Sequence, residues 1–191
     1  IYMRGVGSGN NQGFEQSVGM YVDGIYMGRG RQYRNAFLDL ERVEILRGPQ
    51  GTLFGRNTVA GAVSVITASP TIGEELNGAI SVAAESNNGF ITEGHIGSDI
   101  TDTLAARFAF KYRESDGWID NKYLNEDVPN IEDTTYRLTT VWQPTDELDV
   151  NFKYGHSDEK RTGSTAATWL YLQEPERSEL FPNLGPFASI R

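Results

Sequence analysis

The stretch RGPQGTLFGRN, residues 47–57, raises the question of phosphate chemistry, because its glycines punctuate a turn between two apolar segments. A glycine-rich loop that cradles phosphate has four residues between its glycines, followed by Lys and then Ser or Thr. Here three residues separate Gly51 from Gly55, and Arg56 and Asn57 follow. The sequence therefore predicts no nucleotide site in this turn, and its glycines are expected to permit close backbone packing.

Metal and nucleophilic chemistry are limited by the supply of suitable residues. The chain of 191 residues has no cysteine and only two histidines, His95 and His156. Metal sites usually draw several ligands from His and Cys, and neither histidine has serine and carboxylate partners at the spacing of a catalytic triad. The formal net charge is −9, which opposes nucleic-acid binding because that role needs a basic surface. We expect no metal site, no cofactor, no nucleic-acid partner and no enzyme.

The elements that must position any site differ between the two parts of the chain. Residues 1–70 are rich in glycine and mix short strands with turns, which predicts a small α+β domain. The segment SVGMYVDGIYMG predicts two strands around Asp23-Gly24, a dipeptide that suits a tight hairpin. ERVEIL and AGAVSVITA predict two further strands, and Ser69-Pro70 ends the second of them.

From Leu76 onward, apolar and polar residues alternate with a period of two. Apolar side chains occupy even positions, and polar ones, many of them charged, occupy odd positions. Large aromatics stand near segment ends, at Phe90, Tyr112, Trp142 and Tyr154. The connections 99–103 and 144–146 are short, whereas 115–133 and the part after 157 are polar and predicted to be loops. The five alternating segments are 76–86, 90–100, 103–114, 135–143 and 147–156.

Several architectures use strands of this kind. A soluble antiparallel sheet, as in a carbohydrate-binding module, has one apolar and one polar face. A membrane-spanning barrel has strands of about ten residues with aromatic girdles at both interfaces. The barrel also explains why the odd positions are charged, since they would face a watery lumen. A porin would be such a barrel without a domain inside it. The sequence contains no run of about 18 apolar residues, so it predicts no transmembrane helix.

The segments SVGMYVDGIYMGR and LDLERVEILRGPQGTLFGRNTVAGAVSVIT, followed by Ser-Pro, resemble the plug domain of TonB-dependent outer-membrane receptors. The most specific part is the Arg-Gly-Pro block followed by Phe-Gly-Arg-Asn, and one departure is Ser64, near which the family usually has Asn. The resemblance implies an α+β plug domain, its C-terminal portion, at residues 1–70. It implies that 71–191 hold the first five strands, with outer loops, of an antiparallel transmembrane β-barrel of about 22 strands. We expect the chain to be a piece of a longer protein.

The same resemblance implies a function. Receptors of this family reside in the outer membrane of Gram-negative bacteria, among its lipid and lipopolysaccharide. They bind a scarce ligand, most often a ferric siderophore, and import it with energy from the TonB complex, which contacts a segment before the plug. Cobalamin, an oligosaccharide or an aromatic compound is an alternative ligand, and a surface receptor that signals or binds colicins is an alternative role.

The ligand of such a receptor lies between the plug apices and the outer loops. The resemblance places Arg4 at the pocket, and it makes the segment MGRGRQYR the neighbouring apical loop. Arginine and tyrosine suit an anionic, oxygen-rich chelate because they offer charge-assisted hydrogen bonds and stacking. The expected ligand-binding residues are Arg4, Met27, Arg29, Arg31, Tyr33 and Arg34.

A plug must also be held inside its barrel. We expect ionic contacts inside the plug, and between the plug and lumen-facing charges of the barrel wall, from four charged residues: Glu41, Arg42, Glu44 and Arg47. The candidate partners on the wall are Arg107, Lys111 and Arg137. Exposed ion pairs contribute only about 0–1 kcal/mol each, so such a plug would be held by many weak contacts.

Overall fold

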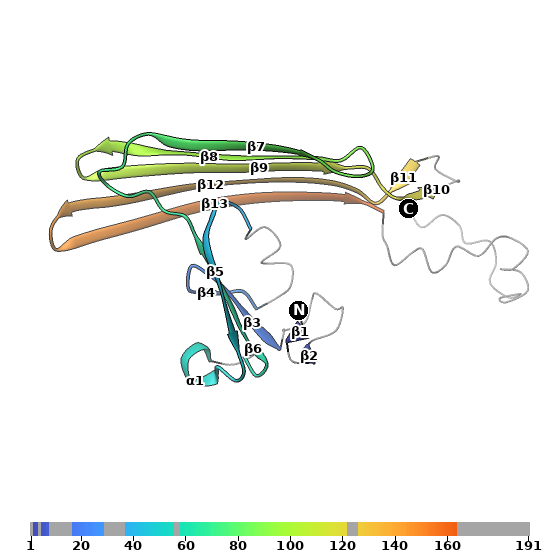
Figure 1. The fold of residues 1–191 in the computed structure, drawn as a ribbon, viewed down its shortest axis with the longest axis horizontal. Helices are drawn as coiled ribbons and strands as arrows, with labels where there is room; N and C mark the ends of the chain where they lie inside the picture. Colours follow the sequence, from blue (N-terminus) through green and yellow to red (C-terminus); the bar gives the residue numbers. More distant parts are fainter. Residues whose placement is uncertain are drawn as a thin grey trace, which may run out of the picture.

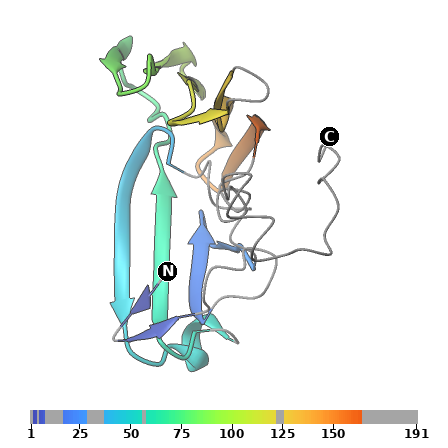
Figure 2. The same cartoon turned by 90° about the vertical axis from the view of Figure 1, so that its right-hand side faces the viewer.

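The computed structural model shows two main β-sheets, a small one followed by a long one, and two separate two-stranded pairs (Figure 1). The structure describes residues 2–3, 5–7, 17–28, 37–55, 58–121 and 126–163. In Figure 1 the small sheet lies against one face of the long sheet, and Figure 2, turned by 90°, shows its strands standing upright below that face, with β3 and β6 pointing toward it and β5 pointing away.

The small sheet has the strand order β4-β3-β6-β5, in which β3 pairs parallel with β6 and the other neighbours pair antiparallel. A separate antiparallel pair, β1 and β2, precedes it. The bounds are β1 Tyr2–Met3, β2 Val6–Gly7, β3 Val18–Val22, β4 Ile25–Tyr26, β5 Leu40–Arg47, α1 Gly51–Phe54 and β6 Gly61–Thr67.

The core of the small sheet follows from its apolar strand positions. Val18, Met20, Ala60, Val63 and Val65 are buried together. The expected hairpin at Asp23-Gly24 is confirmed: both residues have positive φ, 48° and 79°, as a type I′ turn requires. The glycine-rich turn contains one short element that the sequence analysis missed, the single helical turn α1, which is too short to show a helical period.

The long sheet has the order β13-β12-β9-β8-β7, and every neighbouring pair is antiparallel. It therefore contains the five alternating segments in sequence order. Along the chain, a small separate hairpin of β10 and β11 connects β9 to β12. The bounds are β7 Asn77–Ala84, β8 Phe90–Thr101, β9 Leu104–Ser115, β10 Ile119–Asn121, β11 Glu126–Val128, β12 Asn130–Thr145 and β13 Leu148–Thr162.

The prediction of loops at 115–133 and directly after 157 is wrong in part. Strand β12 begins at Asn130 and β13 continues to Thr162. Apart from Ile131, these extensions are polar, so they carry no apolar alternation. Cross-strand polar pairs join them instead: the hydroxyls of Thr135 and Ser157 lie 3.0 Å apart, and Lys160 Nζ lies 3.5 Å from Glu132 Oε2.

The two faces of the long sheet meet different surroundings. Even positions form an exposed apolar face, with Ile80 and Val82 each 72% exposed and Phe152 56% exposed. Odd positions face the small sheet, and there Ala105, Ala109 and Thr139 are 0–1% exposed. Among the residues that the structure describes, no helix is long and apolar enough to cross a membrane.

The exposed apolar face predicts that the folding cost of an added charge depends on which face of the sheet carries it. Phe152→Arg puts a cation near the middle of the apolar band and should cost about 2–4 kcal/mol of folding free energy in a bilayer. Asn151→Arg, one residue away on the opposite face, should cost less than about 1 kcal/mol because that side is polar. Denaturant titration of the full-length protein in lipid vesicles measures both. Equal costs for the two variants would contradict this assignment of faces.

Candidate functional site

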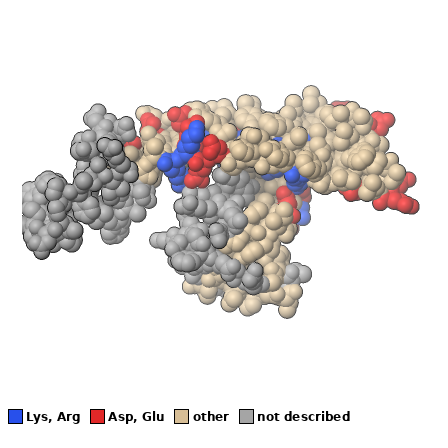
Figure 3. Space-filling model, turned by 180° about the vertical axis from the view of Figure 1, so that it is seen from behind, with Lys and Arg blue, Asp and Glu red and all other residues tan. Residues whose placement is uncertain are grey.

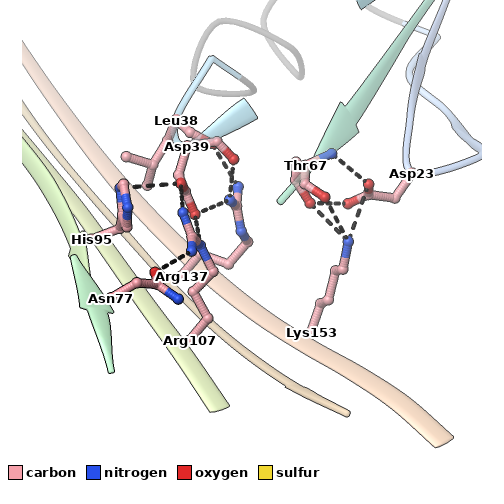
Figure 4. Close-up of polar contacts among 9 residues, drawn as sticks. All are labelled: Asp23, Leu38, Asp39, Thr67, Asn77, His95, Arg107, Arg137 and Lys153. Carbon is pink, nitrogen blue, oxygen red and sulfur yellow. Dashed lines mark hydrogen bonds and ion pairs between the residues drawn. The ribbon is translucent and has the colours of Figure 1, made fainter. Parts of the chain in front are cut away.

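The two sheets meet at Leu38 and Asp39, the residues just before β5 (Figure 4). Leu38 is 2% exposed, and the Asp39 side chain is 6% exposed. Asp39 has a φ of 50°, a left-handed conformation that aspartate adopts more readily than most residues. The turn thus carries a carboxylate to the long sheet.

Two arginines of the long sheet hold the Asp39 carboxylate. Arg107 on β9 donates from Nη2 to Oδ1 at 2.6 Å and from Nε to Oδ2 at 2.8 Å, a bidentate pair. Arg137 on β12 donates from Nη2 to Oδ2 at 3.3 Å. Arg137 also donates to the backbone oxygens of Leu38 and Asp39, each at 2.9 Å. The turn is therefore held by its backbone as well as by its charge.

Two further groups surround this contact. His95 Nδ1 on β8 lies 3.4 Å from Asp39 Oδ1. Arg107 Nη1 donates to Asn77 Oδ1 at 3.2 Å, which ties the guanidinium to the first residue of β7. Four strands of the long sheet, β7, β8, β9 and β12, thus contribute side chains around one carboxylate.

Strand register brings these cations together. Thr139 lies opposite Arg107 on one side and opposite Lys153 on the other, and Arg137 lies opposite Ala109. The small side chains Ala105, Ala109 and Thr139 are buried between the longer ones. We call this arrangement the socket: a floor of Ala105, Ala109 and Thr139 surrounded by His95, Arg107, Arg137 and Lys153.

A second carboxylate, Asp23 in the β3–β4 turn, makes a parallel contact. Lys153 Nζ lies 3.2 Å from Asp23 Oδ1 and donates to Thr67 Oγ1 at 2.8 Å. Thr67, the last residue of β6, donates to Asp23 from its backbone N–H at 2.9 Å and from its hydroxyl at 2.7 Å. One lysine of β13 therefore binds two elements of the small sheet.

Both carboxylates are held in the charged form. Burial alone would raise the pKa of Asp39, but hydrogen bonds and charge from Arg107, with the charges of His95 and Arg137, lower that pKa below its ordinary value. Burial also opposes ionisation of Asp23, and hydrogen bonds from Thr67 together with Lys153 lower the pKa of Asp23.

Other cations of the long sheet have partners within that sheet. Lys111 Nζ lies 3.3 Å from Glu93 Oε2, and Arg113 Nε lies 2.8 Å from Glu85 Oε2. Figure 3 shows basic and acidic side chains gathered together on the long sheet toward the end where β13 finishes. The cations of the socket differ, because the carboxylates that they contact belong to the small sheet.

The structure brings together some of the predicted plug–wall residues. Arg107 and Arg137 contact the small sheet, as expected. Lys111 pairs with Glu93 of its own sheet, which departs from the expectation. Arg42 is paired with Glu41 and Glu44 of the same strand, and all three side chains are about half exposed. Contacts of Glu41, Arg42, Glu44 and Arg47 with a wall stay a prediction.

Neither Asp39 nor Asp23 was expected from the sequence to be a contact residue. Asp23 was assigned only to its turn, and Asp39 stands in the unremarkable segment AFLDL. A usable signal was present in AFLDL, because Asp39 is a single acid between two leucines. An acid in that setting is either exposed or paired, and burial of Leu38 decides for pairing.

Most predicted ligand-binding residues lie outside the described residues, namely Arg4, Arg29, Arg31, Tyr33 and Arg34. Met27 packs against the core of the small sheet, and its N–H donates to the Met20 oxygen at 2.8 Å. Its ligand contact stays a prediction. Within the described part of the chain, no group of three or more His, Asp or Glu side chains could hold a metal ion.

Comparison with known proteins relates the first part of the chain to a known family. Residues 1–62 match the family model of the TonB-dependent receptor plug domain. The pesticin receptor of Yersinia pestis is 37% identical over 70 residues, which cover 37% of this chain and 10% of that receptor. The ferrichrome outer membrane transporter and phage receptor of Escherichia coli is 28% identical over 153 residues, covering 78% of this chain and 19% of that protein.

Solved structures show the same fold across both sheets. The ferric yersiniabactin uptake receptor of Yersinia pestis superposes with a TM-score of 0.69 at 23% identity, over 75% of this chain and 23% of that one. The pyoverdine receptor of Pseudomonas aeruginosa gives a TM-score of 0.63 at 19% identity, over 78% and 22%. The chain spans 10–19% of the length of the curated relatives named here.

The socket predicts that replacing a buried carboxylate weakens the contact between the sheets far more than replacing an exposed one. Asp39→Asn keeps the shape of the turn but removes the charge that two arginines share, and it should weaken the contact between the sheets by about 2–4 kcal/mol. Glu41→Gln, on an exposed side chain of the same turn and strand, should change it by less than about 0.5 kcal/mol. Amide hydrogen exchange of residues 37–47 in the full-length protein measures the contact. Similar exchange in both variants would rule out the buried pair as the main attachment.

The lowered pKa values predict how the contact depends on pH. A carboxylate whose pKa is depressed in the docked state stabilises that state above its free pKa of about 3.9 and loses this stabilisation as pH falls through the docked pKa. The contribution of the two carboxylates to the attachment should therefore be constant above about pH 5 and be lost only below about pH 4. Spin labels at Val43→Cys and Asn151→Cys report the distance between sheets. A distance that changes between pH 5 and 7, and does so equally in Asp39→Asn, would contradict this origin.

Proposed function

We propose that this chain, which carries the plug domain and the first wall strands of a TonB-dependent outer-membrane receptor, works in the capture and import of a ferric siderophore. The ligand binds at the outer side of the plug, and the TonB complex supplies the energy that rearranges the plug. The chain acts as a transport element and carries out no catalysis.

The observation that carries this proposal is the docking of a polar domain against the charged face of a two-faced sheet. A soluble β-sandwich would cover its apolar face, whereas here the apolar face is exposed and the small sheet packs against the charged face. An exposed apolar face suits lipid, and a charged face suits a water-lined lumen. A plain porin has no domain at this position, so the plug favours a gated receptor.

The ligand class is supported by the relatives. The relatives and structures named above include a ferrichrome transporter and receptors for ferric yersiniabactin and pyoverdine. We propose the same broad class, an iron chelate, for this receptor. The partners would be the ferric siderophore, the TonB complex, and the lipid and lipopolysaccharide around the apolar face.

Uptake of labelled iron tests this function. The full-length receptor is expressed in a Gram-negative strain that lacks its own siderophore receptors. The cells are offered a ferric hydroxamate, a ferric catecholate, a ferric phenolate, ferric citrate and cobalamin. Import of one iron chelate that disappears in a strain without TonB supports the proposal. Cobalamin import, or no import from the panel despite normal surface expression, would overturn the siderophore assignment.

The proposed contact of Arg4 with the ligand predicts a change in binding affinity when Arg4 is replaced. Arg4→Ala should weaken binding of an anionic chelate by about 1–3 kcal/mol, because it removes a charge-assisted hydrogen bond. Arg42→Ala is the matched control, since Arg42 is paired within its own strand. Surface binding of the chelate that the panel identifies gives both affinities. Unchanged binding in Arg4→Ala with normal expression would remove Arg4 from the site.

A further inference from the structure

The socket has an asymmetry of charge that attachment of the plug alone does not require. Arg107 and Arg137 share Asp39, and Lys153 contacts Asp23. These three cations thus face two plug carboxylates, whereas Lys111 and Arg113 have carboxylate partners in their own sheet. If the turn at residues 38–39 moves away, two guanidinium groups of the wall lose the carboxylate that they contact.

We propose that the socket is a carboxylate-binding site of the receptor wall, which Asp39 fills at rest and which an oxyanion group of the ligand fills when the turn leaves. The statement about the ligand rests on the proposed function. The statement about the site rests on the geometry alone.

The geometry is that of a receptor for a carboxylate in general. Arg107 directs Nε and Nη2 at the two oxygens of one carboxylate, at 2.8 and 2.6 Å, and Arg137 adds a third N–H at 3.3 Å. These paired donors recognise the planar carboxylate itself, whichever molecule carries it. Arg107 Nη1 also donates to Asn77 Oδ1 at 3.2 Å, so the guanidinium keeps one partner in its own sheet when Asp39 is absent.

The surroundings strengthen such binding. The side chains of Arg107 and Arg137 are each 12% exposed, over a floor of small residues that are 0–1% exposed. Charges that are largely withdrawn from water interact strongly with a partner and are costly without one. An anion that reaches the socket as Asp39 leaves would therefore replace the lost interaction, whereas a neutral or cationic group would not.

The turn itself offers a clean experiment. Asp39 has a φ of 50°, a conformation that glycine adopts without strain. Asp39→Gly therefore keeps the backbone and removes a group of the size and charge of acetate. Amide exchange of residues 37–47 is followed in the full-length receptor with rising acetate, against potassium chloride at equal ionic strength. If Asp39→Gly does not fold without acetate, the yield of folded receptor with and without acetate replaces the exchange measurement.

Acetate should restore protection in Asp39→Gly and have no effect on the wild type or on Asp39→Asn, in which the site is filled. Adding Arg107→Gln to Asp39→Gly should weaken the acetate response about tenfold or more, because the bidentate donor is lost. Adding Lys111→Gln, a cation on the same face with its own partner, should leave it unchanged. No acetate effect, or an equal effect with and without Arg107, would overturn the site.

Uptake tests the ligand half of the proposal. In the Asp39→Asn background, Arg107→Gln should slow uptake of the imported chelate about threefold or more without changing its surface binding, and Lys111→Gln should not. Equal uptake in both double variants, or a chelate without anionic oxygen groups, would overturn this half. If the panel yields no imported chelate, the proposed function and this half fail together, whereas the acetate result decides the site by itself.

Discussion

The arrangement of the two sheets depends on the hydrogen bonds and ion pairs of the Asp39 carboxylate. It is nearly buried, and a buried carboxylate is tolerable only when donors satisfy both oxygens. Arg107 and Arg137 supply those donors from two neighbouring strands, and Arg137 also holds the backbone of the same turn. The position of β5, and of the sheet behind it, follows from where this carboxylate can be satisfied.

The two faces of the long sheet differ in chemistry. In the alternating segments the even positions are largely apolar and exposed, and the odd positions carry the socket and the Lys111–Glu93 pair. Period-two alternation makes this division possible, since neighbouring residues of a strand point to opposite faces. It also explains why small residues matter on the inner face: Ala105, Ala109 and Thr139 leave room for a turn of the plug to approach the wall closely.

The attachment seen here differs in kind from a set of many weak exposed pairs. Two carboxylates, each with several donors and little exposure, make a small number of strong contacts. Such contacts are stable at rest because their partners are complete, and they are sensitive to any event that removes or replaces one partner. A local change at residues 38–39 is therefore enough to alter the contact between the two sheets.

The sequence by itself determined the two kinds of sheet, the hairpin at Asp23-Gly24, the five two-faced strands and the family of the plug, because these are written in neighbouring residues: a turn dipeptide, a period of two and a contiguous motif. It also indicated Arg107 and Arg137, since both stand at odd, inward positions. The tertiary structure decided their partners. Asp39 lies 68 residues from Arg107 and 98 from Arg137, and its place between two leucines indicates neither that it is buried nor which cations it contacts. Only packing of the two sheets buries Asp39 and leaves Glu41 in water.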